Sequence, residues 1–160
     1  VDDTGIFQRA SFDVPDPREG YNTADNARLA IVAALYYETT GSTRYLNMCY
    51  RALSFLQLAF QDGWFREGMA YDRAFLPRDD LQDCYGRCIW ALGFITQRAA
   101  LPHGLRRAAD ALLEAAIPTA AQLTFLRPCA YTVLGPALWQ PQRHTSMLAD
   151  QVALIAAHYP

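Results

Sequence analysis

Apolar residues in this chain follow two alternating helical patterns, and this alternation limits the possible folds more than any other feature. Residues 29–37 are apolar on every side of a helix. The next segment has a single apolar stripe, made of Leu46, Cys49, Leu53, Leu56 and Phe60. The first pattern is typical of a helix buried all round, and the second of a helix with one packed face. The alternation therefore predicts an inner and an outer row of helices.

The same periodicity predicts six helices in three antiparallel pairs. Their expected ranges are about 23–39, 43–61, 83–98, 104–116, 128–139 and 145–158. Thr23 is a favourable cap, Asp25 adds negative charge to the first turn, and Gly41 ends the first helix. The first, third and fifth helices are expected to be buried all round, and the second, fourth and sixth to be amphipathic, as in helical toroids and solenoids. We therefore expect an all-α fold with 1–160 as a single domain.

Residues 62–82 have no helical period. The segment is either an ordered loop or a short two-stranded β-ribbon. Loops of about 20 residues are unusual in compact domains and are often functional.

All 14 basic residues are arginine, and the chain has no lysine. Schiff-base catalysis, pyridoxal phosphate anchoring and the Walker phosphate loop each need a lysine amine, so these classes are excluded. The net charge is −2 and no basic stripe is visible, so we expect no nucleic-acid partner. No apolar run reaches the ~18 residues of a membrane span, and no signal peptide opens the chain. These features predict a cytoplasmic protein without a membrane partner.

The four cysteines do not form a disulfide scaffold in a chain of 160 residues. Cys84 and Cys88 are four residues apart, so they share one helix face, and we interpret all four as small buried residues. The three histidines are scattered singly, whereas a zinc site needs closely spaced ligand pairs. We therefore expect no metal and no cofactor.

Four segments resemble a known family. They are Asp2-Asp3-Thr4-Gly5-Ile6-Phe7-Gln8, Gly20-Tyr21-Asn22-Thr23-Ala24-Asp25-Asn26-Ala27-Arg28, Tyr71-Asp72-Arg73 and Asp83-Cys84-Tyr85-Gly86-Arg87-Cys88-Ile89-Trp90-Ala91-Leu92-Gly93. From residue 2 to about residue 98, the chain resembles an uncharacterised bacterial domain that is found beside or fused to glycosyltransferases. That domain is similar to the six-hairpin glycosidases, which fold as (α/α)6 toroids. The resemblance implies helical hairpins forming half of such a toroid, because a full ring has twelve helices.

Two departures from the family pattern bear on activity. Ala24 and Gln82 stand where the family usually carries acids. Two carboxylates are therefore missing, which favours binding over catalysis.

The resemblance places acidic residues at the starts of successive inner helices, around one cleft. Glycoside hydrolysis needs two carboxyl groups. The expected pair is Asp25 and Asp83, with Asp72 in the long loop as a third candidate. The expected sugar-binding residues are Asp3, Tyr21, Asn26, Arg28, Trp64 and Arg87. Each acid also has a structural interpretation: Asp25 and Asp83 as helix caps or partners of a nearby arginine, and Asp72 as a turn residue.

Three functions remain open. The first is glycoside hydrolase-like or glycosyltransferase-associated catalysis, and the second is a non-catalytic module that binds a glycan or serves as a scaffold for a glycosyltransferase. The third is a plain helical interaction domain. Carbohydrate is the expected ligand. The open edge of a half ring also predicts contact with a second copy, or with a missing C-terminal half.

Overall fold

The computed structural model describes residues 1–77, 81–139 and 141–159, and this part of the chain is mostly helical. Its α-helices are α1 (Thr23–Thr40), α2 (Thr43–Ala59), α3 (Gln82–Thr96), α4 (His103–Ala116), α5 (Leu126–Trp139) and α6 (Thr145–His158). The six predicted helices are confirmed, with bounds that differ by no more than two residues. Short 3-10 helices at Pro17–Glu19, Ile117–Gln122 and Pro141–His144 lie between the longer elements.

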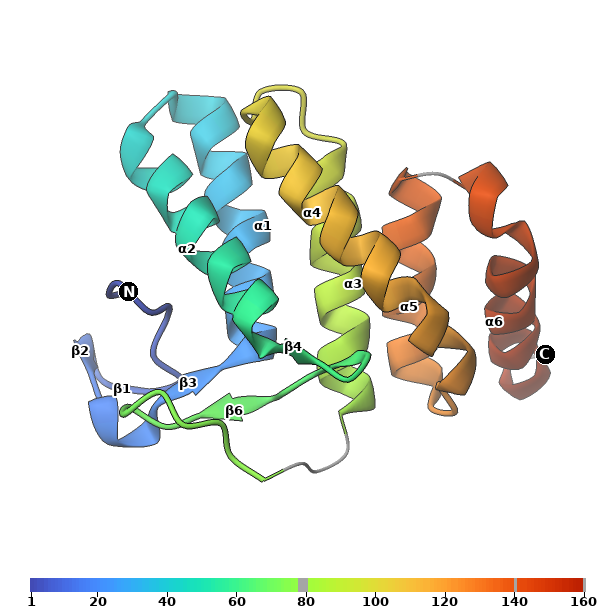
Figure 1. The fold of residues 1–160 in the computed structure, drawn as a ribbon, viewed down its shortest axis with the longest axis horizontal. Coiled ribbons are helices and arrows are strands. Elements are labelled where there is room, and N and C mark those ends of the chain that lie inside the picture. Colours follow the sequence, from blue (N-terminus) through green and yellow to red (C-terminus); the bar gives the residue numbers. More distant parts are fainter. Residues whose placement is uncertain (78–80, 140, 160) are drawn as a thin grey trace.

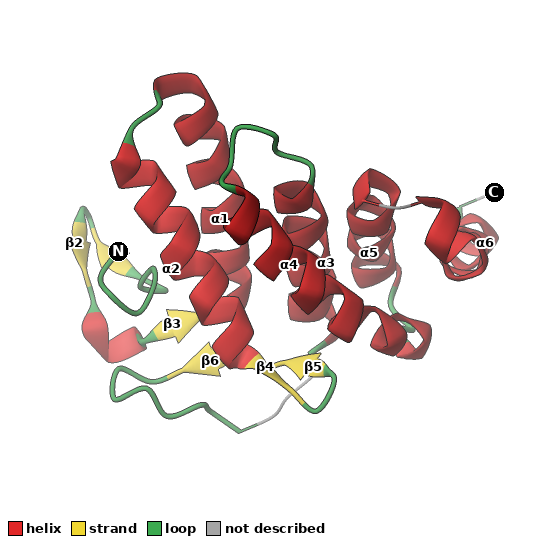
Figure 2. Cartoon of the chain, turned by 45° about the horizontal axis from the view of Figure 1, so that its top comes forward, coloured by secondary structure: helices red, strands yellow, loops and turns green. Residues whose placement is uncertain are grey.

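The helices form two rows (Figures 1 and 2). α3 packs between α1 and α5, and these three helices make the inner row. α2 packs on α1, α4 on α3, and α6 on α5. This arrangement matches the predicted alternation of inner and outer helices.

α3 and α5 touch through their backbones. A Cβ atom on Gly93 would lie 2.2 Å from the carbonyl oxygen of Gly135, and one on Gly135 would lie 2.3 Å from the carbonyl oxygen of Ile89. Atoms at such distances overlap, so only glycine permits this approach. The glycines of this pair therefore set the spacing of α3 and α5.

The prediction that residues 29–37 are buried on every side is wrong. Val32, Leu35 and Tyr36 are 49%, 43% and 52% exposed. The helix stands at one end of the inner row, and α2 and α3 cover only its other faces. The same prediction is wrong for α5, where Leu134 is 45% exposed, and the apolar stripe predicted for α6 is incorrect at Val152, which is half exposed.

Two short strands lie within the segment 62–82, but each pairs with a strand outside that range, so the predicted two-stranded ribbon is only partly borne out. β4 (Phe60–Gln61) pairs with β5 (Trp64–Phe65) in a hairpin, which ends α2 two residues early. β6 (Gly68–Met69) pairs instead with β3 (Tyr21–Asn22), directly before α1. β1 (Ala10–Ser11) and β2 (Val14–Pro15) form a third pair. Residues 78–80 of the predicted loop lie outside the described residues.

A second small core lies beneath α2, at the N-terminal end of α1. It is formed by Tyr21, Phe55, Ala59 and Met69, with Phe7 and Phe75 packed against them. Backbone pairing runs across this layer from Phe7 to Tyr21, from Tyr21 to Met69, and from Met69 to Phe75. Segments far apart in sequence therefore meet at the start of α1.

All four cysteines are free thiols and are buried, as predicted. Burial raises the pKa of Cys49 to about 12, so this thiol is a packing residue. Among the helices described, none is both long enough and apolar enough for a bilayer crossing. In the same part of the chain, no three His, Cys, Asp or Glu side chains cluster as metal ligands would.

Candidate functional site

Asn26 fastens the N-terminal segment to the start of α1. Its side chain is fully buried; the amide oxygen accepts a hydrogen bond from the Ile6 backbone N–H at 3.1 Å, and the amide nitrogen donates to the Asn22 carbonyl at 3.0 Å. Gly5 permits this close approach, because a Cβ there would lie 2.4 Å from the Asn26 amide oxygen. Segment 2–8 therefore has a fixed position beside α1.

Asp2 holds the other end of this segment. Its carboxylate accepts backbone N–H bonds from Thr4 at 2.8 Å and Gly5 at 3.0 Å, and the Tyr21 hydroxyl donates to it at 2.6 Å. Partial burial alone would raise the pKa of Asp2, but these hydrogen bonds outweigh burial and lower it. The ionised form is therefore the one that stabilises the segment.

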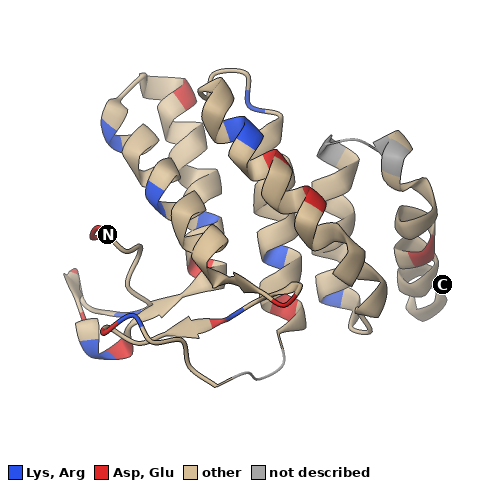
Figure 3. Ribbon diagram, in the orientation of Figure 1, with Lys and Arg blue, Asp and Glu red and all other residues tan. Residues whose placement is uncertain are grey.

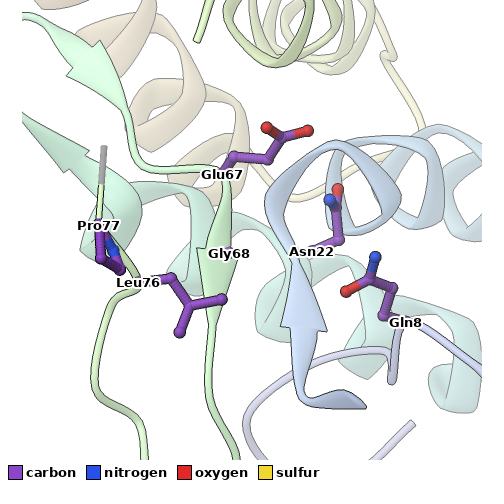
Figure 4. A pocket seen from close by; sticks show the side chains of 6 residues that line it. All are labelled: Gln8, Asn22, Glu67, Gly68, Leu76 and Pro77. Carbon is purple, nitrogen blue, oxygen red and sulfur yellow. The ribbon is translucent and has the colours of Figure 1, made fainter. Parts of the chain in front are cut away.

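Two hollows open beside this anchored segment. The first, which we call the α1 hollow, has a volume of about 370 Å³ and is lined by Ile6, Phe7, Gln8, Asp25, Arg28, Leu29 and Val32. The second, the Glu67 hollow, has a volume of about 300 Å³ and is lined by Gln8, Asn22, Glu67, Gly68, Leu76 and Pro77 (Figure 4). Because Gln8 lines both, the two hollows adjoin.

Charged groups gather at the starts of the inner helices (Figure 3). Asp25 forms an ion pair with Arg28. Asp83 forms ion pairs with Arg87 at 2.8 Å and with Arg127, from α5, at 2.6 Å. The Arg87 guanidinium also lies within electrostatic reach of Asp25. The two predicted helix starts are therefore neighbours, and each acid is held by at least one arginine.

Aromatic rings extend the Asp83 cluster along the inner row. The Arg87 guanidinium lies over the Tyr131 ring, 4.8 Å from its centroid. Tyr131 in turn stacks on Trp90, with ring centroids 5.6 Å apart. Cation–π contact and stacking restrain this arginine, which fixes the position of its ion pair with Asp83.

The environment of Asp83 decides its ionisation. Partial burial would raise the pKa of Asp83, but hydrogen bonds from Arg87 and Arg127, with their positive charges, outweigh burial and lower it. A general acid in glycoside hydrolysis needs a raised pKa. Asp83 therefore lacks the property that a proton donor requires.

We expect the free energy of unfolding of Asp83→Asn to fall less than that of the wild type as the pH is lowered. Because the folded-state pKa lies below the ordinary value of 3.8, ionised Asp83 stabilises the fold above about pH 4, and this contribution disappears as the pH falls through the lowered pKa. The carboxylate is partly exposed, so we expect a loss of only about 0.5–1 kcal/mol at pH 7. Urea unfolding at pH 7 and pH 3 should show a smaller pH-dependent change for the variant. Equal changes in both proteins would contradict this assignment.

Several predicted residues support the site without lining either hollow. Tyr21 is buried between Phe7 and Phe55, so its ring has no face open to a ligand. Asn26 is also buried, and both ends of its amide are occupied. Trp64 packs edge to face with Tyr85, with ring centroids 5.5 Å apart.

Asp3 and Asp72 lie apart from the helix starts. Asp3 pairs with Arg51 of α2 at 2.9 Å and lines a separate hollow of about 150 Å³. Asp72 is exposed and accepts the Ala74 backbone N–H at 3.0 Å, which is the turn role that sequence reasoning left open. Of the nine predicted residues, only Asp25 and Arg28 line one of the two adjoining hollows.

Sequence reasoning missed Glu67. The pairing of β6 with β3 brings it beside Asn22, and its carbonyl accepts the Thr23 backbone N–H at 2.8 Å. Two-residue strands leave no periodic pattern, so the only available signal was its place in the unusual segment 62–82.

No protein-family model matches this chain, and no curated protein matches it either.

Proposed function

We propose that this chain is a carbohydrate-binding domain and that a sugar occupies the α1 hollow. The observation that carries the proposal is the lining of that hollow. One wall is apolar, and the Asp25–Arg28 pair and the Gln8 amide supply both hydrogen-bond donors and acceptors. Sugar rings present apolar C–H faces edged by hydroxyl groups that both donate and accept hydrogen bonds. A mostly apolar wall with a few placed polar groups suits such a ligand.

Binding without hydrolysis is the form of this function that the site supports best. Hydrolysis needs one carboxyl group as a proton donor and a second as nucleophile or base. Asp83 has a lowered pKa and two arginine partners, and Asp25 is paired with Arg28. These pairings agree with the absence of acids at Ala24 and Gln82.

The two rows of helices also support the half-toroid that the resemblance implies. In such a ring, the exposed face of α1 would meet the next helical hairpin. Val32 and Tyr36 lie four residues apart on this face, with Leu35 between them. This apolar patch favours a second candidate function, an interaction module that contacts another copy of the chain through α1.

A glycan array separates the two candidates. We expect the wild-type chain to bind neutral oligosaccharides, and Arg28→Ala to weaken this binding at least tenfold. The variant removes charged hydrogen-bond donors, which are typically worth about 1.5–3 kcal/mol. Arg44→Ala, which changes an exposed arginine of α2, is the matched control and should bind as the wild type does.

Absence of binding to every glycan on the array would overturn the proposal and favour the interaction module. Equal binding by Arg28→Ala and the wild type would show that the sugar does not bind in the α1 hollow. Release of new reducing ends from a bound oligosaccharide would show hydrolysis, and so would contradict the non-catalytic form.

A further inference from the structure

We infer that the Glu67 hollow is a second sugar subsite, so that the chain binds a glycan of at least two units and rejects an acidic sugar at this end. The inference rests on the proposed function of the α1 hollow. It assigns a binding role to Glu67, and it defines the length and charge of the ligand.

The shared lining residue gives the ligand length. Gln8 is exposed and belongs to both hollows, so a ligand in one can continue past this side chain into the other. Their volumes, about 370 and 300 Å³, each lie at the small end of the ~300–1,000 Å³ usual for small-molecule sites. One hollow therefore suits a single small unit, and the two together suit a longer ligand.

The backbone holds Glu67 firmly at the rim. Its carbonyl accepts the Thr23 backbone N–H at 2.8 Å, and the next residue, Gly68, pairs with Asn22 across the β3–β6 ladder. Gly68 also accepts the Leu76 backbone N–H at 2.9 Å, which fixes the apolar side of the hollow. Figure 4 shows Glu67 and Leu76 on the two sides of the Gly68 strand. A rigid frame lowers the cost of ordering the site when a ligand binds.

The Glu67 side chain is available to a ligand. It is half-buried and, within the part of the chain that the structure describes, makes no hydrogen bond or ion pair. It differs in this respect from Asp25 and Asp83, which arginines hold. A carboxylate only accepts hydrogen bonds, and those it receives from hydroxyl groups are strong. Glu67 can therefore accept from one or two sugar hydroxyls.

Asn22 supplies the opposite polarity across the hollow. Its amide oxygen caps α1 by accepting the backbone N–H groups of Ala24 at 2.8 Å and Asp25 at 3.3 Å. The amide nitrogen makes no bond to other described residues, so it can donate to a ligand oxygen. An acceptor and a donor that line the same hollow fit the paired hydroxyls of a sugar, and Leu76 and Pro77 add apolar lining.

The charge of Glu67 sets the selectivity. A uronic acid placed here would bring a second carboxylate next to one that has no cation to balance it, and like charges at short range repel. A neutral sugar or a sugar with a free amine meets no such repulsion. The α1 hollow has no such bias, because the charges of Asp25 and Arg28 offset one another.

Isothermal titration calorimetry with defined sugars tests the inference. The probes are maltose, cellobiose, lactose and chitobiose, their monosaccharides, and disaccharides that carry glucuronic acid at either end. We expect a disaccharide to bind the wild type at least tenfold more tightly than its monosaccharides do. Glu67→Gln should abolish most of this difference and admit the glucuronic acid disaccharides. Asp150→Asn, an exposed acid of α6, is the matched control and should behave as the wild type.

The outcomes separate the inference from the function on which it rests. Unchanged disaccharide affinity in Glu67→Gln, with a loss in Arg28→Ala, would overturn the second subsite and leave the α1 hollow as a sugar site. Equal wild-type affinity for monosaccharides and disaccharides would also overturn it. Failure of the wild type to bind any sugar on the panel would overturn the proposed function and the second subsite together.

Discussion

Gly93→Ala should lower the melting temperature of the protein by about 5–10 °C. The added Cβ would lie 2.2 Å from the Gly135 carbonyl oxygen and 2.5 Å from its Cα, so backbone atoms must move. Overpacking of this kind typically costs about 1–3 kcal/mol and sometimes more. The higher helix propensity of alanine offsets about 1 kcal/mol of this cost. The obstacle is backbone, which cannot move aside as a side chain can, so we expect a steric cost of about 3 kcal/mol or more. We therefore expect a net loss of about 2–3 kcal/mol, measured by thermal and urea unfolding.

A second glycine supplies the matched control. Gly104 lies in the first turn of α4, and a Cβ there would meet nothing within 4 Å. Gly104→Ala should therefore leave stability unchanged or raise it by up to about 1 kcal/mol. A melting temperature for Gly93→Ala at or above that of the wild type would contradict the close packing of α3 against α5.

Asn26→Ala should release the N-terminal segment from α1. The variant removes the hydrogen bonds that the Asn26 amide makes with the Ile6 backbone N–H and the Asn22 carbonyl, each typically worth about 0.5–1.5 kcal/mol. Loss of these two bonds lets segment 2–8 detach from α1, which is local and not global unfolding. We expect much faster amide exchange in residues 2–8 and weaker oligosaccharide binding, because Ile6, Phe7 and Gln8 line the α1 hollow.

Hydrogen exchange followed by mass spectrometry measures the first effect directly. Asn47→Ala, at an exposed position of α2, is the control and should leave exchange in residues 2–8 unchanged. Unaltered protection of residues 2–8 in Asn26→Ala would show that other contacts suffice to hold the segment.

Hydrophobic periodicity predicted the helices well, because a helix buries a stripe whose spacing is visible in one short window. It failed for the burial of Val32 and Leu35, because exposure there depends on which helices stand beside α1. The β3–β6 pair could not be predicted either. Strands of two residues are too short to show a hydrophobic period, and the paired residues Asn22 and Gly68 lie 46 positions apart in the sequence.

The candidate site was predictable only in part, for similar reasons. Spacings of three and four residues correctly favoured the Asp25–Arg28 and Asp83–Arg87 pairs, since such residues are neighbours on a helix. The lowered pKa of Asp83 was not predictable, because it depends on Arg127 from α5 as well. Tyr21 lies four residues before Asp25 in sequence, yet the second core buries its ring.

The most direct test of the account is to locate a bound oligosaccharide on the protein by NMR. The ¹H–¹⁵N spectrum of the labelled chain would be recorded during titration with the tightest ligand from the array. We expect the largest shifts at the backbone amides of residues 6–8, 22–29 and 67–68, with α6 unaffected. Shifts centred on α2 or α6, or an unchanged spectrum at saturating sugar, would contradict a carbohydrate site at the start of α1.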